Sequence, residues 1–350
     1  MTAYPIGGTD AEKKTYRPEI YDNNIVLTRI RLARNVKGYP FYIADKTTAA
    51  DIVKRVARAA GRAGEFRLYH LSMLSKNMRE MLKERHLVSS ALIKNAARSA
   101  VLIDKDESLS VMIHEEDVLR EQCFMRGLAL DECYKRLDAL DDELSKSVDF
   151  AYDDKLGYLT ACPTNAGTGL RASVMLFLPA LTESGKLKEV VEEIERLGLT
   201  VRGAYGEGSK AEGNLYQVSN EVTLGMSERE IITEVEEAVL SVCDWERETR
   251  ESYYKPIMLS TENECRRALA VLENSVLLTY SEYLSYISSV KLGLSLGFFR
   301  FENPQAIDDL TITARPANLT ERAGRALGEE EREHYRAEFV KKSLIKIKGE

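Results

Sequence analysis

Arginines in distinctive contexts are the side chains of this sequence best suited to chemistry. Arg29 and Arg31 stand two residues apart in a block that alternates apolar residues with arginine, so a strand would point both to one face. Three more follow along the chain, at Arg120, Arg171 and Arg202. An arginine stays charged and can bind phosphate through two parallel hydrogen bonds. Five that converge would hold a nucleotide triphosphate, whereas a dispersed set would be ordinary surface charge.

Carboxylates in two short segments are the second candidates for chemistry. Glu115, Glu116 and Asp117 come just after an apolar run that ends at Ile113. Such a row of acids is either a hydrated loop or a base together with ligands for the hydration shell of Mg²⁺. Glu207 lies between two glycines, which favours either a plain turn residue or a mobile loop that closes over a substrate.

A glycine-rich loop follows a strand-like run at 157–161. The loop contains Cys162, Pro163 and two glycines and leads to Arg171, so backbone N–H groups and a guanidinium could meet around an anion. It is not a Walker A loop, because no Gly-Lys-Ser/Thr follows. Cys162 is either a buried structural residue or a thiol that nearby arginines activate as the thiolate.

The composition is that of a globular enzyme and argues against several other classes. Of the 350 residues, 44% are hydrophobic and 30% are charged. A net charge of −7 gives no electrostatic case for a nucleic-acid partner, and no apolar run reaches the roughly 18 residues of a membrane span. The five cysteines are scattered, and no signal-peptide pattern is present. We therefore expect a cytoplasmic protein with reduced thiols.

Apolar periodicity predicts an α+β fold in which an antiparallel sheet is flanked by helices. Helices are expected at 46–65, 75–84, 119–144 and 187–197, and a capping box at Ser227 and Glu230 opens another. Strands are expected at 24–34, 101–103, 109–113, 158–161, 173–178, 201–205 and 215–218. After about residue 255 the pattern becomes mostly helical. Six apolar residues there are expected to form a core or, in part, a subunit interface: Leu277, Leu278, Tyr283, Ile287, Leu292 and Leu294.

Four blocks carry most of the chemical candidates: TRIRLAR at 28–34, EEDVLR at 115–120, CPTNAGTGLRASV at 162–174 and RGAYGE at 202–207. In content, order and spacing they resemble the signature blocks of the phosphagen kinases, which include the creatine and arginine kinases. Within that superfamily the sequence is most similar to the bacterial protein-arginine kinases. The arginine block begins near residue 28, the segment 204–220 resembles that subgroup's glutamate loop, and a helical region follows. There, Arg332, Glu333 and Arg336 resemble a phosphoarginine-binding motif, with Glu333 in place of aspartate.

The resemblance implies a domain organisation and a role for each candidate. Residues 1–22 would form an N-terminal arm, 23–255 a phosphagen-kinase-like catalytic domain, and 256–350 a helical domain for phosphoarginine binding and dimerisation. The arginines at 29, 31, 120, 171 and 202 would clamp the phosphates of ATP. Glu116 would orient and deprotonate the substrate guanidinium with Glu207 as its partner, and Cys162 would line that site. Glu115 and Asp117 would lie near the hydration shell of Mg²⁺.

The resemblance also implies cofactors and partners. The cofactors would be ATP and Mg²⁺. The partners would be proteins with exposed arginines, a Clp-type unfoldase and protease, a zinc-binding activator protein, a heat-shock repressor and a second copy of the chain. Phosphorylation would mark proteins for proteolysis in the stress response.

Two other functions stay open on the sequence. A kinase of free arginine or another small guanidino compound would use the same arginines and glutamates, although the Ala204-Tyr205 version of the loop argues against it. A catalytically silent module could read phosphoarginine through Arg332 and Arg336 alone. The presence of all five arginines and both glutamates speaks against a silent module.

Overall fold

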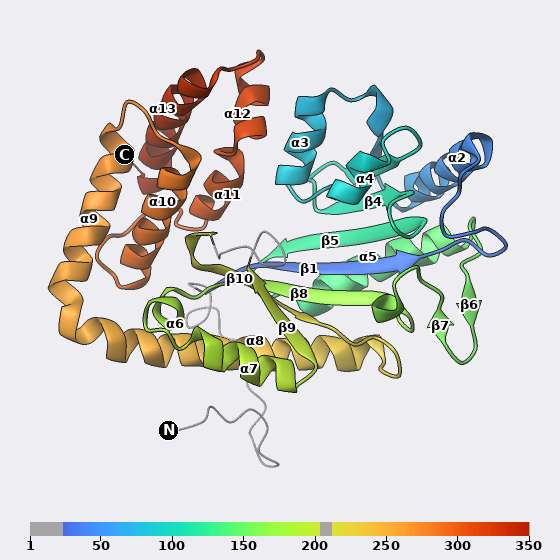
Figure 1. Ribbon diagram of the computed structural model, residues 1–350, viewed down its shortest axis with the longest axis horizontal. Helices are drawn as coiled ribbons and strands as arrows, with labels where there is room; N and C mark the ends of the chain where they lie inside the picture. Colours follow the sequence, from blue (N-terminus) through green and yellow to red (C-terminus); the bar gives the residue numbers. More distant parts are fainter. Residues whose placement is uncertain (1–23, 204–211, 350) are drawn as a thin grey trace.

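The main sheet has eight strands, and every neighbouring pair is antiparallel (Figure 1). The computed structural model describes residues 24–203 and 212–349, so the expected arm at 1–22 lies outside the described residues. In sheet order the strands are β2 (Phe66–His70), β3 (Ala100–Asp104), β4 (Leu109–Ile113), β5 (Leu119–Arg126), β1 (Ile25–Arg34), β8 (Leu170–Phe177), β10 (Leu215–Asn220) and β9 (Leu199–Gly203). A small separate hairpin pairs β6 (Tyr152–Asp153) with β7 (Gly157–Tyr158). The predicted α+β class is confirmed.

Helices cover both faces of the sheet and make up most of the C-terminal region. Around the sheet they are α2 (Lys46–Ala63), α3 (Lys76–Glu84), α4 (Ser90–Lys94), α5 (Leu130–Ser145), α6 (Pro179–Glu183), α7 (Leu187–Arg196) and α8 (Glu228–Tyr254). The C-terminal helices are α9 (Met258–Asn274), α10 (Tyr280–Ser295), α11 (Ala306–Thr313), α12 (Pro316–Ala323) and α13 (Glu329–Lys348). The predicted capping box opens α8, because the side chains of Ser227 and Glu230 each accept a hydrogen bond from the backbone N–H of the other residue.

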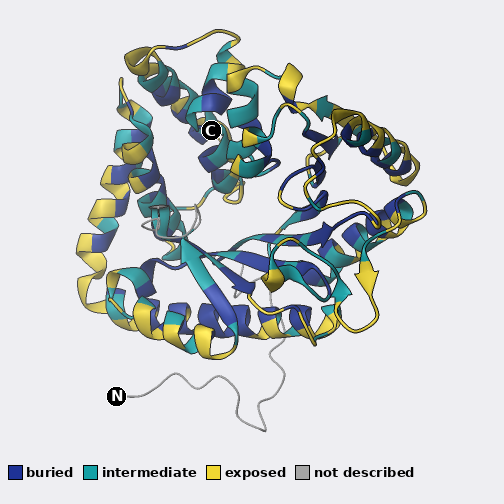
Figure 2. Cartoon of the chain, turned by 45° about the vertical axis from the view of Figure 1, so that its right-hand side comes forward, coloured by how far each residue is buried: buried dark blue, intermediate teal, exposed yellow. Residues whose placement is uncertain are grey.

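The two faces of the sheet carry opposite kinds of side chain. On β1, Ile30 and Leu32 are buried in the main core, which α5 and α8 complete on that side (Figures 1 and 2). Arg29 and Arg31 alternate with them and therefore face the other side. That second face is covered at one end by α3 and α4 and approached at the other by the C-terminal helices (Figure 1).

The C-terminal helices share an apolar cluster with the sheet. Phe177 at the end of β8 and Tyr254 at the end of α8 pack in one cluster with Cys265 of α9 and Leu292 of α10. The 27-residue helix α8 runs beneath the sheet and continues through a short turn into α9 (Figure 1). The two regions are thus joined by a shared core as well as by the chain.

The six apolar residues expected in the C-terminal core differ in how far they are buried. Leu278, Tyr283, Ile287 and Leu292 are buried, and Leu294 is partly buried against the same helices. Leu277 is 47% exposed, so it does not belong to the core.

The helix expected at 119–144 is wrong over its first part. Residues Leu119–Arg126 form the central strand β5, and the helix α5 begins only at Leu130, after Gly127 turns the chain with φ 66°. Glu121 and Gln122 are fully buried within this strand. A strand is predicted from apolar and polar residues that alternate along the chain, and buried polar residues such as these interrupt that alternation.

The strand expected at 158–161 is also largely wrong. Only Gly157 and Tyr158 pair, with β6. Beyond them the backbone bonds elsewhere, since Leu159 N donates to the carbonyl of Ala151 at 2.9 Å and Ala161 N donates to the carboxylate of Asp117 at 2.7 Å. A side chain therefore takes the place of a neighbouring strand. The expected strand at 201–205 is observed as Leu199–Gly203, and its last two residues lie outside the described part.

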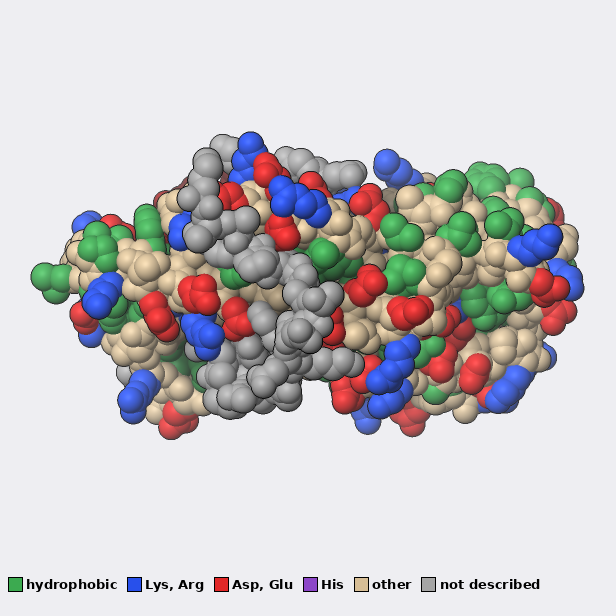
Figure 3. All heavy atoms as spheres, turned by 90° about the horizontal axis from the view of Figure 1, so that it is seen from below, with side chains coloured by type: hydrophobic (Ala, Val, Ile, Leu, Met, Phe, Trp, Pro, Cys, Tyr) green, Lys and Arg blue, Asp and Glu red, His purple; other side chains and the backbone are tan. Residues whose placement is uncertain are grey.

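Acidic and basic side chains are interspersed on the face shown in Figure 3. In the part of the chain that the structure describes, no helix combines the length and the apolar character needed to cross a membrane.

Candidate active site

The sheet register brings the arginines singled out by the sequence to one face. They are Arg29 and Arg31 on β1, Arg120 on β5, Arg171 on β8 and Arg202 on β9. Directly opposed residues of antiparallel strands share a face. Arg31 lies opposite Arg171, and Arg120 lies opposite Ala33, two residues along β1. Arg202 lies opposite Gln217 of β10, which in turn lies opposite Met175 of β8. Four strands thus contribute arginines to a single cationic floor, the arginine floor.

The charges on this floor act on one another. Burial, followed by the charges of Arg120 and Arg171, lowers the pKa of Arg29 to about 9. Burial and the neighbouring arginines, Arg29 first among them, lower the pKa of Arg31 well below its ordinary value. Burial and then the Arg202 charge lower the pKa of Arg171. Within the described residues, the buried Nε atoms of Arg29, Arg31 and Arg171 have no hydrogen-bond partner. A polyanion would neutralise this charge and use these donors.

The acids at 115–117 form the tight turn between β4 and β5. His114 N donates to the carbonyl of Val118 at 2.8 Å, and His114 adopts the left-handed conformation with φ 64°. Glu115 is buried and pairs with Arg120 at 2.7 Å, while Ser89 Oγ and the N–H of Glu116 also donate to its carboxylate. Burial alone would raise the pKa of Glu115, but the Arg120 charge and these hydrogen bonds lower it. Glu115 therefore holds Arg120 in place.

Glu116 is the one exposed carboxylate of the turn. Within the described residues no side chain donates a hydrogen bond to it. Burial, followed by the charges of Glu115 and Asp117, raises its pKa. A raised pKa in an accessible carboxylate beside a cationic floor is what a general base needs.

Asp117 is buried and ties the acidic turn to the cysteine loop. Its Oδ1 accepts from Asn35 Nδ2 and from Ala161 N, each at 2.7 Å. Ala161 directly precedes Cys162, so the carboxylate of Asp117 sets where the loop begins. Burial raises the pKa of Asp117 in spite of these two hydrogen bonds.

We expect Asp117→Ala to lower the free energy of unfolding by about 2 kcal/mol, because it removes the acceptor shared by the buried Asn35 amide and the Ala161 N–H. Asp117→Asn keeps one carbonyl oxygen in the same place and should be nearly as stable as the wild type. Thermal unfolding of both variants tests this anchoring role. A raised Mg²⁺ requirement in Asp117→Asn at unchanged stability would instead indicate a role at the metal.

Cys162 is partly exposed, so the alternative of a buried structural cysteine is wrong. Its Sγ lies 3.0 Å from Thr164 Oγ1, and Cys162 is close enough to Arg171 to influence the pKa of that guanidinium. The thiol therefore lies at the rim of the cationic floor.

The two glycines of the cysteine loop are required by close packing. A side chain at Gly167 would meet the carbonyl of Thr223 at 2.6 Å, and one at Gly169 would meet the carbonyl of Ala33 at 2.6 Å. Both have positive φ, 102° and 67°. The loop is held from the other side by Arg34, whose Nη1 donates to the carbonyl of Thr168 at 2.9 Å.

An apolar cavity that sequence reasoning missed continues the arginine floor. It has a volume of about 210 Å³ and is lined by Leu27, His86, Met175, Leu215 and Ile312, among others. A smaller cavity shares three of these residues and reaches Arg29. Leu27 lies two residues before Arg29 and Met175 four after Arg171, so strand periodicity could have placed both on the arginine face.

The C-terminal motif is placed far from this floor along the chain, on α13. Arg336 is 2% exposed, and it donates through Nε to the carbonyl of Ala314 at 3.0 Å and through Nη1 to that of Leu278 at 2.8 Å. Arg332 and Glu333 are half-buried. Arg336 therefore fastens three C-terminal segments together.

Replacing Arg336 with alanine should cost about 3 kcal/mol of stability, because two buried carbonyls lose their donor. Arg332→Ala should have little effect on stability. Thermal unfolding and phosphoarginine binding measured on both variants would separate folding from recognition. Equal stability of the two variants would contradict the structural role of Arg336.

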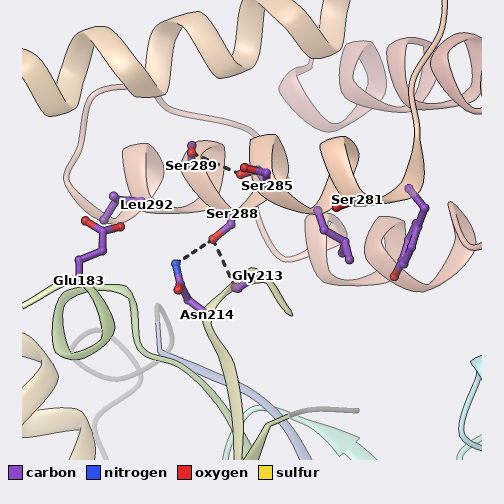
Figure 4. A pocket seen from close by; sticks show the side chains of 10 residues that line it. Glu183, Gly213, Asn214, Ser281, Ser285, Ser288, Ser289 and Leu292 are labelled. Carbon is purple, nitrogen blue, oxygen red and sulfur yellow. Dashed lines mark hydrogen bonds between the residues drawn. The ribbon is translucent and has the colours of Figure 1, made fainter. Parts of the chain in front are cut away.

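A further pocket of about 400 Å³ lies between α6, the start of β10 and α10 (Figure 4). Ser288 of α10 accepts from Asn214 at 3.1 Å and donates to the carbonyl of Gly213 at 3.3 Å (Figure 4). The described residues that line the pocket include Glu183 and several serines but no lysine or arginine. It lacks the charge that a triphosphate requires, so the arginine floor is the candidate site.

The described residues contain no cluster of three histidine, cysteine or acidic side chains that could hold a metal ion. Glu207 lies outside the described residues.

Known proteins share both the fold and the site-bearing segments. Residues 48–249 match the family model of the ATP:guanido phosphotransferase C-terminal catalytic domain, and residues 259–350 match that of the protein-arginine kinase McsB C-terminal domain. A taurocyamine kinase structure from Schistosoma mansoni has a TM-score of 0.60 at 31% identity, over 69% of this chain and 35% of that duplicated one. A lombricine kinase structure has a TM-score of 0.56 at 25% identity, over 65% of this chain and 67% of that one. Fold and site thus define a guanidino phosphotransferase.

Full-length relatives narrow this class. A protein-arginine kinase from Clostridium acetobutylicum is 39% identical over 340 residues, covering 95% of this chain and 99% of the relative. One from Caldanaerobacter subterraneus subsp. tengcongensis is 41% identical over 333 residues, covering 93% and 98%. The chain belongs to the protein-arginine kinase family.

Proposed function

We propose that this protein transfers the γ-phosphoryl group of ATP to arginine side chains of proteins. The observation that carries the proposal is the convergence of five arginines on one sheet face, with Glu116 and Cys162 at its rim. The names of the full-length relatives support arginine in proteins as the acceptor.

The triphosphate would lie across the arginine floor. In the transition state, negative charge lies on the transferred phosphoryl group and on the leaving oxygen. The residues that would neutralise this charge are Arg29, Arg31, Arg120, Arg171 and Arg202. The apolar cavity beyond Arg29, which is lined by Leu27, His86 and Met175, would bind the adenine ring of ATP. This orientation directs the γ-phosphate toward the Glu116 turn.

The acceptor chemistry requires a base at that turn. An arginine guanidinium has a pKa of about 12.5 to 13.8, so reaching the neutral nucleophile at pH 7 costs roughly 8 kcal/mol. Glu116 would take the proton as the guanidino nitrogen attacks phosphorus. The new N–P bond forms while the bond from phosphorus to the ADP oxygen breaks, and ADP leaves with its electron pair. Glu207 and Cys162 would keep the planar guanidinium in line for attack.

Mg²⁺ fits this site as an ion carried by the nucleotide phosphates. Both oxygens of Glu115 and one oxygen of Asp117 already accept hydrogen bonds, which leaves few oxygens for direct ligation. Mg²⁺ commonly keeps several waters and binds through substrate phosphates. Glu115 and Asp117 would then lie near its waters, and the ion would supply charge neutralisation at the phosphates.

The cellular role follows from the same proposal. Phosphoarginine would mark proteins for a Clp-type unfoldase and protease, with a heat-shock repressor among the substrates and a zinc-binding protein as activator. The enzyme would work as a cytoplasmic homodimer. Arg332 and Glu333 would contact phosphoarginine, while the buried Arg336 would hold in place the helices that carry them.

Incubation with Mg-ATP tests the activity directly. An unfolded protein and free arginine should be compared as acceptors, with phosphate located by mass spectrometry under conditions that preserve the N–P bond. Phosphate on protein arginine supports the proposal. Transfer to free arginine alone would favour the small-guanidine kinase, and no transfer at all would favour the silent binding module.

A further inference from the structure

A chain of hydrogen bonds links the C-terminal helix α12 to a phosphate-clamp arginine more than a hundred residues away in sequence. We infer that Gln122 and Glu84 are positioning residues for Arg29, through which docking of the C-terminal helices sets the affinity for ATP. The inference rests on the proposed role of Arg29 at the triphosphate.

Gln122 forms the first link. Arg29 Nη2 donates to Gln122 Oε1, and the amide of Gln122 in turn donates to the carbonyl of His86 at 2.8 Å and to Ser110 Oγ at 2.6 Å. Because a guanidinium can only donate, the amide oxygen must face Arg29. Gln122 is fully buried, and both its amide N–H groups and its amide oxygen make hydrogen bonds. The guanidinium, which also lies over the ring of Phe124 at 5.1 Å, is therefore fixed by where Gln122 stands.

His86 forms the second link. It follows the end of α3 and takes the left-handed conformation, with φ 61°, which turns its carbonyl toward Gln122. The N–H groups after the helix lock this turn, since Leu87 N donates to the carbonyl of Leu82 at 2.9 Å. Burial and the charges of Arg29 and Arg315 lower the pKa of His86 to about 3, so its ring is neutral at pH 7.

Glu84 and Arg85, the two residues before His86, form the third link. Glu84 accepts from the N–H groups of Ala317 and Asn318, each at 3.0 Å, and from Asn318 Nδ2 at 2.8 Å. Arg85 Nε donates to Asn318 Oδ1 at 2.8 Å. A carboxylate at the first turn of a helix meets free N–H groups and the positive end of the helix dipole. A shift of α12 would therefore move the backbone of residues 84–86.

The α3–α12 contact offers a matched control. Asn77 lies on the same helix as Glu84 and donates to the carbonyl of Ala317 at 3.3 Å and to Glu321 Oε2 at 3.2 Å. It contributes to docking but stands one helix length from His86. Loss of Asn77 weakens the contact without touching the chain of hydrogen bonds to Arg29.

The test uses the full-length enzyme and measures Kd for an ATP analogue together with KM and kcat. Gln122→Leu and Glu84→Ala should each raise Kd and KM for ATP about tenfold, while KM for the protein substrate stays unchanged. Asn77→Ala should leave both ATP constants within about twofold. The double variant should be no weaker than the stronger single one, since two residues on one path are not additive. Glu84→Gln keeps one acceptor oxygen and should restore part of the affinity.

Several results would overturn the inference. Equal shifts in Asn77→Ala and Glu84→Ala would mean that docking in general, not this path, affects ATP. Unchanged ATP constants in Gln122→Leu and Glu84→Ala, with Arg29→Ala strongly impaired, would refute the path and leave the clamp intact. An Arg29→Ala enzyme with normal ATP affinity would refute the proposed clamp itself. Should the variant of the buried Gln122 fail to fold, the variants of the partly buried Glu84 still decide between these results.

Discussion

Replacing Glu116 by glutamine should lower kcat by about two to four orders of magnitude while ATP affinity changes less than about twofold. The substitution keeps the size of the side chain but removes the proton acceptor. Glu116 is exposed and has no partner among the described side chains, so neither folding nor the arginine floor should suffer. Rates of phosphoarginine formation and binding of an ATP analogue measure the two quantities separately.

The pH dependence follows from the same carboxylate. Burial, followed by the charges of Glu115 and Asp117, raises the pKa of Glu116 above its ordinary 4.5. A base with a raised pKa is protonated, and so inactive, once the pH falls through that value. The acidic limb of kcat/KM should therefore lie above pH 4.5 in the wild type and vanish in Glu116→Gln.

Glu115→Gln is the matched control for this prediction. Glu115 pairs with Arg120 at 2.7 Å, so its loss should weaken ATP binding. The acidic limb should remain but move to lower pH, because the Glu115 charge no longer raises the pKa of Glu116. A Glu116→Gln enzyme with normal kcat, or one that loses ATP affinity as Glu115→Gln does, would contradict the assignment of the base.

Replacing Arg31 by methionine should have opposite effects on activity and stability. Burial and three neighbouring arginines lower the pKa of Arg31 well below its ordinary value, which means that its charge is unfavourable in the unliganded protein. We expect the variant to gain about 1 kcal/mol in free energy of unfolding and to lose about 10²- to 10³-fold in kcat/KM. Thermal unfolding and steady-state kinetics give the two numbers.

Arg34→Met is the counterpart on the other face of the same strand. Arg34 pairs with Asp141 at 2.9 Å, and both side chains are under a tenth exposed. Burial alone would lower the pKa of Arg34, but the charge of Asp141 and its hydrogen bonds raise it. Breaking this buried pair should cost about 3 to 5 kcal/mol. If both methionine variants lose stability, the arginine floor is not under charge repulsion.

Local patterns in the sequence were enough for part of the site. The alternation around Arg29 and Arg31 predicts that both face one side, which the strand β1 confirms. Convergence with Arg120, Arg171 and Arg202 depends on the strand order, which no local pattern contains. Similarity to a known family supplied that information instead.

Other features could not be read because their partners are distant in the chain. Asp117 looks like one acid of three, yet its carboxylate accepts from Asn35 and Ala161. Glu121 and Gln122 made the buried strand β5 look like a helix, although both are fully buried. In each case tertiary contacts, not local preference, decide the role of a polar residue.

Because α8 continues almost directly into α9, the protein is difficult to truncate between its two regions. One family model ends at residue 249 and the other begins at residue 259, so a fragment with the first region alone is an obvious choice for expression. Such a truncation would cut a helical stretch and remove Cys265 and Leu292 from their contacts with Phe177 and Tyr254. It would leave an apolar surface exposed to water at the end of the fragment. The halves are therefore poor modules for shuffling, and a fragment ending near 254 should precipitate unless the missing helices are added back.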